Sequence, residues 1–103
     1  MTAAWKMAEK QAARMLNGHR RSRGVDFSLP DVSHSRFAVE VKYRKTLPRL
    51  LRSGLARAAR YSSQKMPVLI IKERGVHGAL VVLKLSDFKN LIGPLIAPVE
   101  TEA

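Results

Sequence analysis

Residues 29–43, LPDVSHSRFAVEVKY, are the stretch that decides how this chain folds. From residue 36 to residue 43 apolar and other side chains alternate, the two-residue period of a strand with one buried face. The apolar positions are Phe37, Val39 and Val41. Residues 29–32 are long enough for a short strand before it, and a hairpin between the two would bring Asp31 beside Glu40.

Two amphipathic helices are expected on either side of this hairpin. Apolar residues at helical spacing predict a helix over residues 3–16, which Asn17-Gly18 would end with a left-handed cap. Pro48 suits the first position of a second helix that runs to about Ser62. The expected inner faces consist of Trp5, Ala8, Ala12, Met15 and Leu16 in the first helix and Leu50, Leu51, Leu55, Ala58 and Tyr61 in the second.

The remaining segments complete an α/β pattern. Residues 19–28 predict a short strand followed by a loop, and residues 67–72 and 79–85 predict two strands, the first of them buried, joined by the turn at residues 75–78. Ser86-Asp87 would cap a short helix ending near Leu91. An irregular tail is expected over about 93–103. The order helix, three strands, helix, two strands, short helix predicts a single domain over residues 1–103 with a mixed central sheet.

Charge indicates the partner. The chain carries 19 Lys and Arg against 8 Asp and Glu, a formal net charge of +11 in 103 residues. Such an excess favours a polyanion, with nucleic acid first, because neutralising phosphates releases counterions. A membrane surface is the less favoured partner, since no basic amphipathic terminal segment or lipidation signal is present. We expect a cytoplasmic protein without a membrane partner or small-molecule cofactor.

Chemistry is expected where Asp31, Glu40 and Lys42 converge. On a strand, Glu40 and Lys42 point to the same face about 6–7 Å apart. Two adjacent carboxylates repel each other, and a hard divalent ion relieves that repulsion. Oxygen ligands in a chain without cysteine suit Mg²⁺, with Mn²⁺ able to substitute. Each fragment alone also has an ordinary structural interpretation, a solvated Glu-x-Lys pair and a Pro-Asp turn.

Two basic clusters are candidates for contacts with the DNA backbone. Between Lys42 and Arg60 the chain has seven basic residues and no acid. A face of one sign next to a candidate metal site is typical of a surface that follows a nucleic-acid backbone. The expected contacts are Arg44, Lys45, Arg49 and Arg52, together with the loop residues Arg20, Arg21 and Arg23.

Pro30-Asp31, eight residues and then Glu40-Val41-Lys42 resemble the signature of the PD-(D/E)xK nucleases. The whole stretch from Trp5 to Phe88 resembles the archaeal-type Holliday junction resolvases, especially short phage-encoded forms. The stretches that carry the likeness are Trp5-Lys6 with Glu9, Pro30-Asp31-Val32, Phe37 to Arg44, Leu47-Pro48, Glu73-Arg74-Gly75 and Leu85 to Phe88. This resemblance implies a restriction-endonuclease-like core in a homodimer that cuts four-way DNA junctions with Mg²⁺, in a prokaryotic or phage-infected cytoplasm.

The resemblance also implies roles for individual residues. Asp31 and Glu40 would bind the metal, the Val41 carbonyl would add a ligand, and Lys42 would assist the nucleophile. Glu9 would be an auxiliary acid that helps to hold metal or water. It also lies one turn after Trp5 at the border of the apolar stripe, where a lone carboxylate is poorly placed without a partner.

Several alternatives stay open at this level. Asp26 is a rival to Asp31 as a metal or water contact, and His34 lies close enough in sequence to touch a phosphate. One alternative function is that of a nuclease of the same type that acts on duplex ends, flaps or specific sites. Another, of a different class, is that of a basic architectural DNA-binding protein without catalysis.

Overall fold

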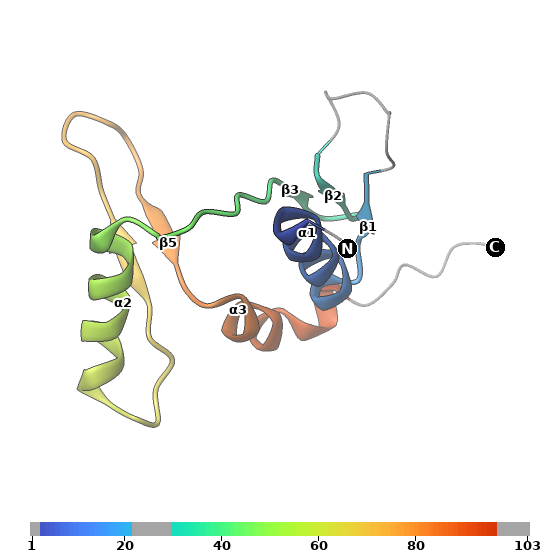
Figure 1. The fold of residues 1–103 in the computed structure, drawn as a ribbon. Helices are drawn as coiled ribbons and strands as arrows, with labels where there is room; N and C mark the ends of the chain where they lie inside the picture. The colour runs from blue at the N-terminus through green and yellow to red at the C-terminus, as the bar shows by residue number, and fades with distance from the viewer. Residues whose placement is uncertain (1–2, 22–29, 97–103) are drawn as a thin grey trace. The chain divides into compact units, whose positions relative to one another are not determined.

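The structure, a computed structural model, describes residues 3–21 and 30–96. Its elements confirm the predicted order of helix, three strands, helix, two strands and short helix, and with it the α/β class (Figure 1). They are α1 (Ala4–Leu16), β1 (His19–Arg20), β2 (Val32–Ser33), β3 (Ala38–Val39), α2 (Arg49–Tyr61), β4 (Leu69–Ile71), β5 (Leu80–Val82), α3 (Leu85–Leu91) and the 3-10 helix η1 (Gly93–Ile96).

The chain divides into two compact units. The first comprises residues 1–43 and 89–103 and contains α1 with the sheet β1–β2–β3. The second comprises residues 44–88 and contains α2 with the hairpin β4–β5. Gly93–Ile96, at the start of the predicted irregular tail, forms η1, and residues 97–103 lie outside the described part of the chain.

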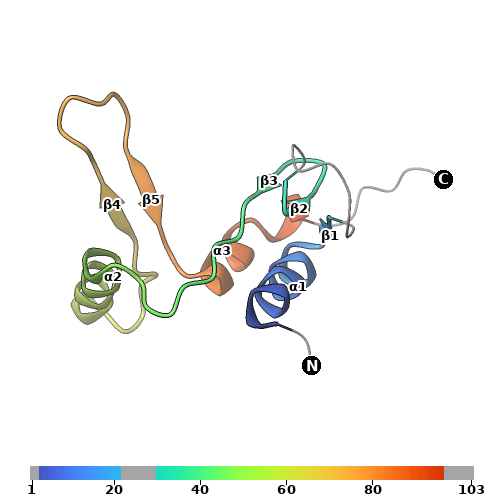
Figure 2. The same ribbon diagram turned by 45° about the horizontal axis from the view of Figure 1, so that its top comes forward.

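In the first unit, α1 packs against β1 and β2 (Figures 1 and 2). Asn17 ends the helix as predicted, in the left-handed conformation with φ 55°. Among the described residues of this unit, the buried apolar ones are Ala12, Ala13, Leu16 and Val32. Small alanines let the helix approach the sheet closely, so Val32 is fully buried beneath it. The close packing of Val32 against α1 holds β2 in place. Asp31 is the residue directly before β2.

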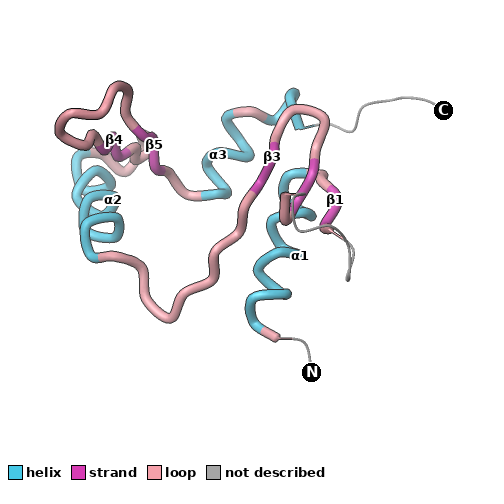
Figure 3. The backbone as a smooth tube through the Cα atoms, turned by 90° about the horizontal axis from the view of Figure 1, so that it is seen from above, coloured by secondary structure: helices cyan, strands magenta, loops and turns pink. Residues whose placement is uncertain are grey.

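The strands pair with their neighbours along the chain. Sheet order is β1–β2–β3, and both pairings are antiparallel, with Arg20 opposite Val32 and Val32 opposite Val39. The hairpin predicted between the second and third strands is therefore confirmed. The prediction of a single mixed sheet is wrong, because the described strands form two separate antiparallel sheets. A loop over residues 40–48 separates β3 from the next element (Figure 3).

In the second unit, α2 covers one face of the β4–β5 hairpin. Leu69 lies against Gly54 of the helix, where an added Cβ would approach the leucine methyl carbons to 2.8 Å. Ile70 and Val81, paired across the strands, are both 59% exposed. The prediction of a buried strand over residues 67–72 is therefore wrong, because within this unit one face of the hairpin has no cover. The turn at 75–78 is confirmed by positive φ at Gly75 and Gly78.

Other apolar positions also differ from the expected core. Trp5 is 50% exposed, while Leu50 and Tyr61 at the edge of the α2 apolar face are exposed as well. Periodicity identified the apolar side of each helix but not how far the small sheets would extend over it. Leu85 starts α3, so Ser86 and Asp87 belong to its first turn and do not precede it as a cap. None of the helices described is both long and apolar enough to cross a membrane.

Replacing Gly18 by alanine should destabilise the first unit. A Cβ at Gly18 would lie 2.7 Å from the Ser33 carbonyl oxygen and 2.7 Å from a Val32 methyl carbon. Because one of these neighbours is backbone, β2 would have to shift, at a cost of about 1–3 kcal/mol. Urea denaturation measures the loss. Gly93→Ala is the control, since nothing lies within 4 Å of its added Cβ; equal stability of the two variants would contradict the close contact.

Candidate functional site

The register of the first sheet places three charged residues in one row. Continuing the pairings of β1, β2 and β3 by one residue sets Arg21 opposite Asp31 and Asp31 opposite Glu40. The Arg21 backbone N–H donates to the Asp31 carbonyl at 2.9 Å, which supports the first of these pairs. Side chains directly opposite each other share a face, with Cβ atoms about 4.5–5.5 Å apart. Asp31 therefore has a cation on one side and a carboxylate on the other.

Asp31 is the best fixed residue of this row. Only 8% of its surface is exposed. Its Oδ2 accepts the Val41 backbone N–H at 2.7 Å, and its Oδ1 lies 3.6 Å from Nη2 of Arg21. A buried carboxylate needs such partners, because burial of an unpaired charge is costly. The Asp31 carboxylate is thus anchored directly on the Glu40-Val41-Lys42 segment.

Glu40 and Lys42 form an exposed ion pair, with Lys42 Nζ 3.0 Å from Glu40 Oε2. The hydrogen bond and the charge of Glu40 raise the pKa of Lys42 above its ordinary value, and the charge of Asp31 adds to this effect. Lys42 therefore remains a cation throughout the neutral range. It is suited to stabilising negative charge and unsuited to accepting a proton.

Glu9 has a different partner from the one expected. Its Oε1 lies 2.8 Å from Nε of Arg20, and both side chains are partly buried. Arg21 directly follows Arg20, the last residue of β1. Side chains of successive residues in extended backbone point to opposite faces of the sheet, so Arg20 and Arg21 face different sides. Across residues 3–21 and 30–96, no three His, Cys, Asp or Glu residues gather into a group that could hold a metal. Glu9 is thus paired with Arg20 and is not brought together with Asp31 and Glu40.

The chemistry of the donor atoms fits a hard divalent ion. Asp31 and Glu40 provide carboxylate oxygens, Val41 provides a carbonyl, and Mg²⁺ is often bound through one or two carboxylates with water completing its shell. Each carboxylate already has a cationic neighbour, Arg21 or Lys42. An ion at this place would therefore have to compete with the chain's own cations.

The predicted DNA contacts fall into two groups. Arg20 and Arg21 each face a carboxylate of the chain, a role that their basic cluster did not suggest. Arg44, Lys45, Arg49 and Arg52 are exposed, the last two on the first turn of α2.

Arg23 and Asp26 lie outside the described residues. His34 accepts the Arg36 backbone N–H at Nδ1, a contact within the β2–β3 turn.

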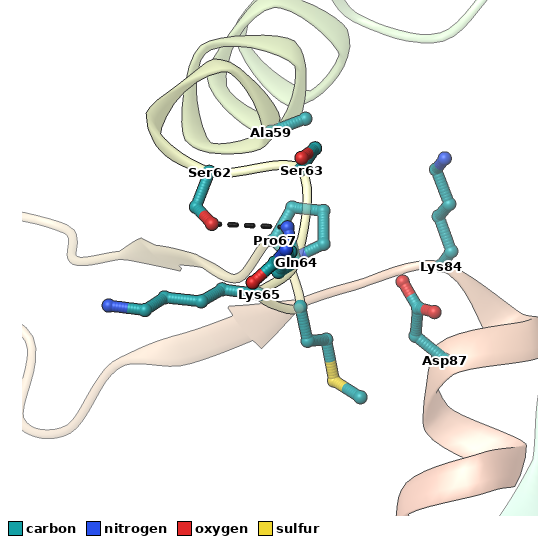
Figure 4. Close-up of a pocket in the computed structure, with 9 residues that line it drawn as sticks. Ala59, Ser62, Ser63, Gln64, Lys65, Pro67, Lys84 and Asp87 are labelled. Carbon is teal, nitrogen blue, oxygen red and sulfur yellow. Dashed lines mark hydrogen bonds between the residues drawn. The ribbon is translucent and has the colours of Figure 1, made fainter.

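Sequence reasoning did not anticipate a polar cavity of about 440 Å³ in the second unit. Figure 4 shows its lining after the end of α2, where the Ser62 hydroxyl accepts the Gln64 backbone N–H, and at the start of α3, where Lys84 and Asp87 lie. Lys65 also lines it. These residues belong to no recognisable sequence motif. The lysines among them, Lys65 and Lys84, are the one sequence feature that could have indicated a polar site here.

Replacing Glu40 by glutamine should lower the pKa of Lys42 toward its ordinary value. The substitution removes the carboxylate charge that raises this pKa, which leaves the smaller contribution of Asp31. A pH titration of the lysine side-chain signals by NMR measures the change. Glu73→Gln removes an acid that does not contribute to this pKa shift and should leave Lys42 unaffected. An unchanged Lys42 pKa in Glu40→Gln would show that the ion pair does not persist in solution.

Comparison with known proteins gives no relative: no family model, no curated protein and no solved structure matches the chain significantly.

Proposed function

We propose that this protein is a metal-dependent DNA endonuclease of the PD-(D/E)xK type that resolves four-way junctions. One observation carries the proposal. The Asp31 carboxylate accepts the Val41 N–H at 2.7 Å, so the two halves of the motif, ten residues apart, meet at one place. On this proposal the two described units belong to a restriction-endonuclease-like core within one nuclease domain.

The residues around this contact have distinct roles in the proposed reaction. Asp31 and Glu40, with the Val41 carbonyl, would hold Mg²⁺ or Mn²⁺, which supplies Lewis acidity at the scissile phosphate. Lys42 remains protonated and lies next to Glu40, where its charge would stabilise the negative charge that develops on the phosphate. Glu9 would act at a distance, because its carboxylate holds Arg20 on β1 next to Arg21.

Positive charge is unevenly divided along the chain, and this supports DNA as the substrate. Residues 44–88 contain ten Lys and Arg against two Asp and Glu, whereas the remaining residues contain nine against six. The 44–88 segment would therefore follow the phosphate backbone, with Arg44, Lys45, Arg49 and Arg52 as its leading contacts. The acids that would hold the metal lie in the other, less basic unit.

Selection of four-way junctions and a homodimeric assembly rest on the resemblance of the motif to the archaeal-type resolvases. A two-fold symmetric dimer would place one centre on each of two equivalent strands of a junction. Within this proposal the substrate is branched DNA, and the cofactor is Mg²⁺, with Mn²⁺ as substitute.

The ion pairs of the site favour a second candidate function. Because Arg21 and Lys42 already balance Asp31 and Glu40, these carboxylates do not require a metal to be stable. A basic architectural protein that binds DNA without cutting it would use the same charges. Cleavage distinguishes this candidate from the nuclease.

Cleavage of a four-way junction should require both a divalent ion and Glu40. We expect symmetric nicks with Mg²⁺, none with chelator, and a loss on the order of 100-fold in Glu40→Ala. Junction, matched duplex and flap DNA are incubated with each protein and resolved on denaturing gels. Binding by Glu40→Ala should be retained or improved, because a negative charge has been removed from the phosphate path.

Glu73→Ala is the matched control, since it removes an acid of the 44–88 segment and should cut normally. Equal cutting of duplex and junction would rule out junction selectivity but retain a nuclease. Metal-independent DNA binding without any cleavage would contradict the nuclease and support the architectural function.

Removing two arginines from α2 should weaken DNA binding in a salt-dependent way. The double variant Arg49→Ala/Arg52→Ala should reduce the slope of log K against log salt by about 2, one phosphate contact for each arginine. Fluorescence anisotropy over a salt series measures the slope. The double variant Lys10→Ala/Arg14→Ala removes the same charge from exposed positions on α1 and should keep the original slope. Equal reductions in both would indicate attraction by net charge alone.

A further inference from the structure

Arg21 is held next to Asp31 by its backbone and by its side chain. Its N–H donates to the Asp31 carbonyl at 2.9 Å, and its Nη2 lies 3.6 Å from the Asp31 Oδ1. Both side chains are largely buried, at 22% and 11% exposed. Burial reduces the screening of this pair by water and salt. The guanidinium is therefore a lasting neighbour of the carboxylate.

We propose that Arg21 is a counter-ion that competes with the divalent metal for the Asp31 carboxylate, and that DNA phosphate relieves this competition. The inference rests on the proposed function, because it assumes that Asp31 is a metal ligand. It assigns to Arg21 a positioning role at the metal site that differs from a simple contact with the DNA backbone.

The two oxygens of Asp31 make the competition direct. Oδ2 is committed to the Val41 N–H at 2.7 Å, a short hydrogen bond to the backbone. Oδ1 is the oxygen that faces Arg21. A divalent ion bound at Oδ1 would lie within a few ångströms of the guanidinium, and like charges at that separation repel strongly in a partly buried site. Metal binding therefore requires Arg21 to turn away.

Once displaced from Asp31, Arg21 can pair with a DNA phosphate. A guanidinium pairs with a phosphate through two parallel hydrogen bonds, so a DNA backbone at the site would be a good replacement for Asp31. Metal and DNA would then each favour the binding of the other, and this coupling must be reciprocal. Arg20 is paired differently, because its partner is Glu9 on α1, which does not form a metal-holding group with Asp31 and Glu40 among the described residues.

The test measures metal binding by the full chain without any nuclease reaction. Mn²⁺ binding is followed by electron paramagnetic resonance of the free ion for wild type, Arg21→Gln, Arg21→Lys and Arg36→Gln. Arg36 is exposed in the β2–β3 turn, so its variant loses the same charge as Arg21→Gln. We expect Arg21→Gln to bind Mn²⁺ roughly five- to tenfold more tightly than wild type, whereas Arg36→Gln and the charge-retaining Arg21→Lys bind like wild type. Far-UV circular dichroism checks that each variant is folded.

Adding Asp31→Asn to Arg21→Gln should abolish the gain, which locates it at this carboxylate. A saturating, non-cleavable phosphorothioate junction should raise the Mn²⁺ affinity of wild type more than that of Arg21→Gln, because the variant has no ion pair left to release. Equal or weaker Mn²⁺ binding by Arg21→Gln, with measurable binding by wild type, overturns the inference and leaves the metal site intact. No Mn²⁺ binding by any of these proteins overturns the inference and the metal site together.

A measurement on the wild-type chain alone keeps the inference testable if Arg21→Gln does not fold. During a titration with Mg²⁺, the NMR signals of the Asp31 carboxyl carbon and the Arg21 Nε should shift together with one midpoint. A shift of the Asp31 signal without any change at Arg21 Nε would overturn the competition.

Discussion

The hydrogen bond from the Val41 N–H to the Asp31 carboxylate is the interaction on which the rest of the site depends. At 2.7 Å it joins the residue before β2 to the segment after β3, so it closes the hairpin at its open end. The next residue, Val32, is fully buried against α1. The packing of one side chain therefore fixes the position of its neighbour, and through it the distance between the halves of the motif. A carboxylate buried to this degree would be costly without such a donor.

Local patterns along the chain predicted much of the fold. The C-terminal end of α1 and the β2–β3 hairpin follow from an αL cap and a two-residue period, which act over a few residues. The start of α2 was predicted one residue early, because Pro48 has a non-helical ψ of 137° and precedes the helix, which begins at Arg49. The single mixed sheet and the buried 67–72 strand were wrong, because they depend on which distant strands pair and which faces are covered. Periodicity shows that a face is apolar, and Ile70 illustrates that an apolar side chain can still be largely exposed.

The candidate site likewise has contacts that the sequence predicted and contacts that it did not. The approach of Asp31 to Glu40 and Lys42 was predictable, since strand geometry and a short hairpin suffice for it. The partners of Arg20 and Arg21 were not, because a basic cluster looks the same whether it faces phosphate or the chain's own acids. The antiparallel register of β1 with β2 would have identified Asp31 as the residue opposite Arg21. For Glu9, the need for a partner was evident from its place on α1, and Arg20 meets that need.

We have proposed that divalent ions bind at the Asp31–Val41 contact. Paramagnetic broadening of backbone amide signals by substoichiometric Mn²⁺ tests this most directly, because the effect falls steeply with distance from the ion. We predict that the amides of Asp31, Glu40 and Val41 broaden first, ahead of those around Glu9 and around the cavity lined by Asp87. Broadening that begins at Asp87, or that spreads evenly over all exposed acids, would contradict a metal centre at this hairpin.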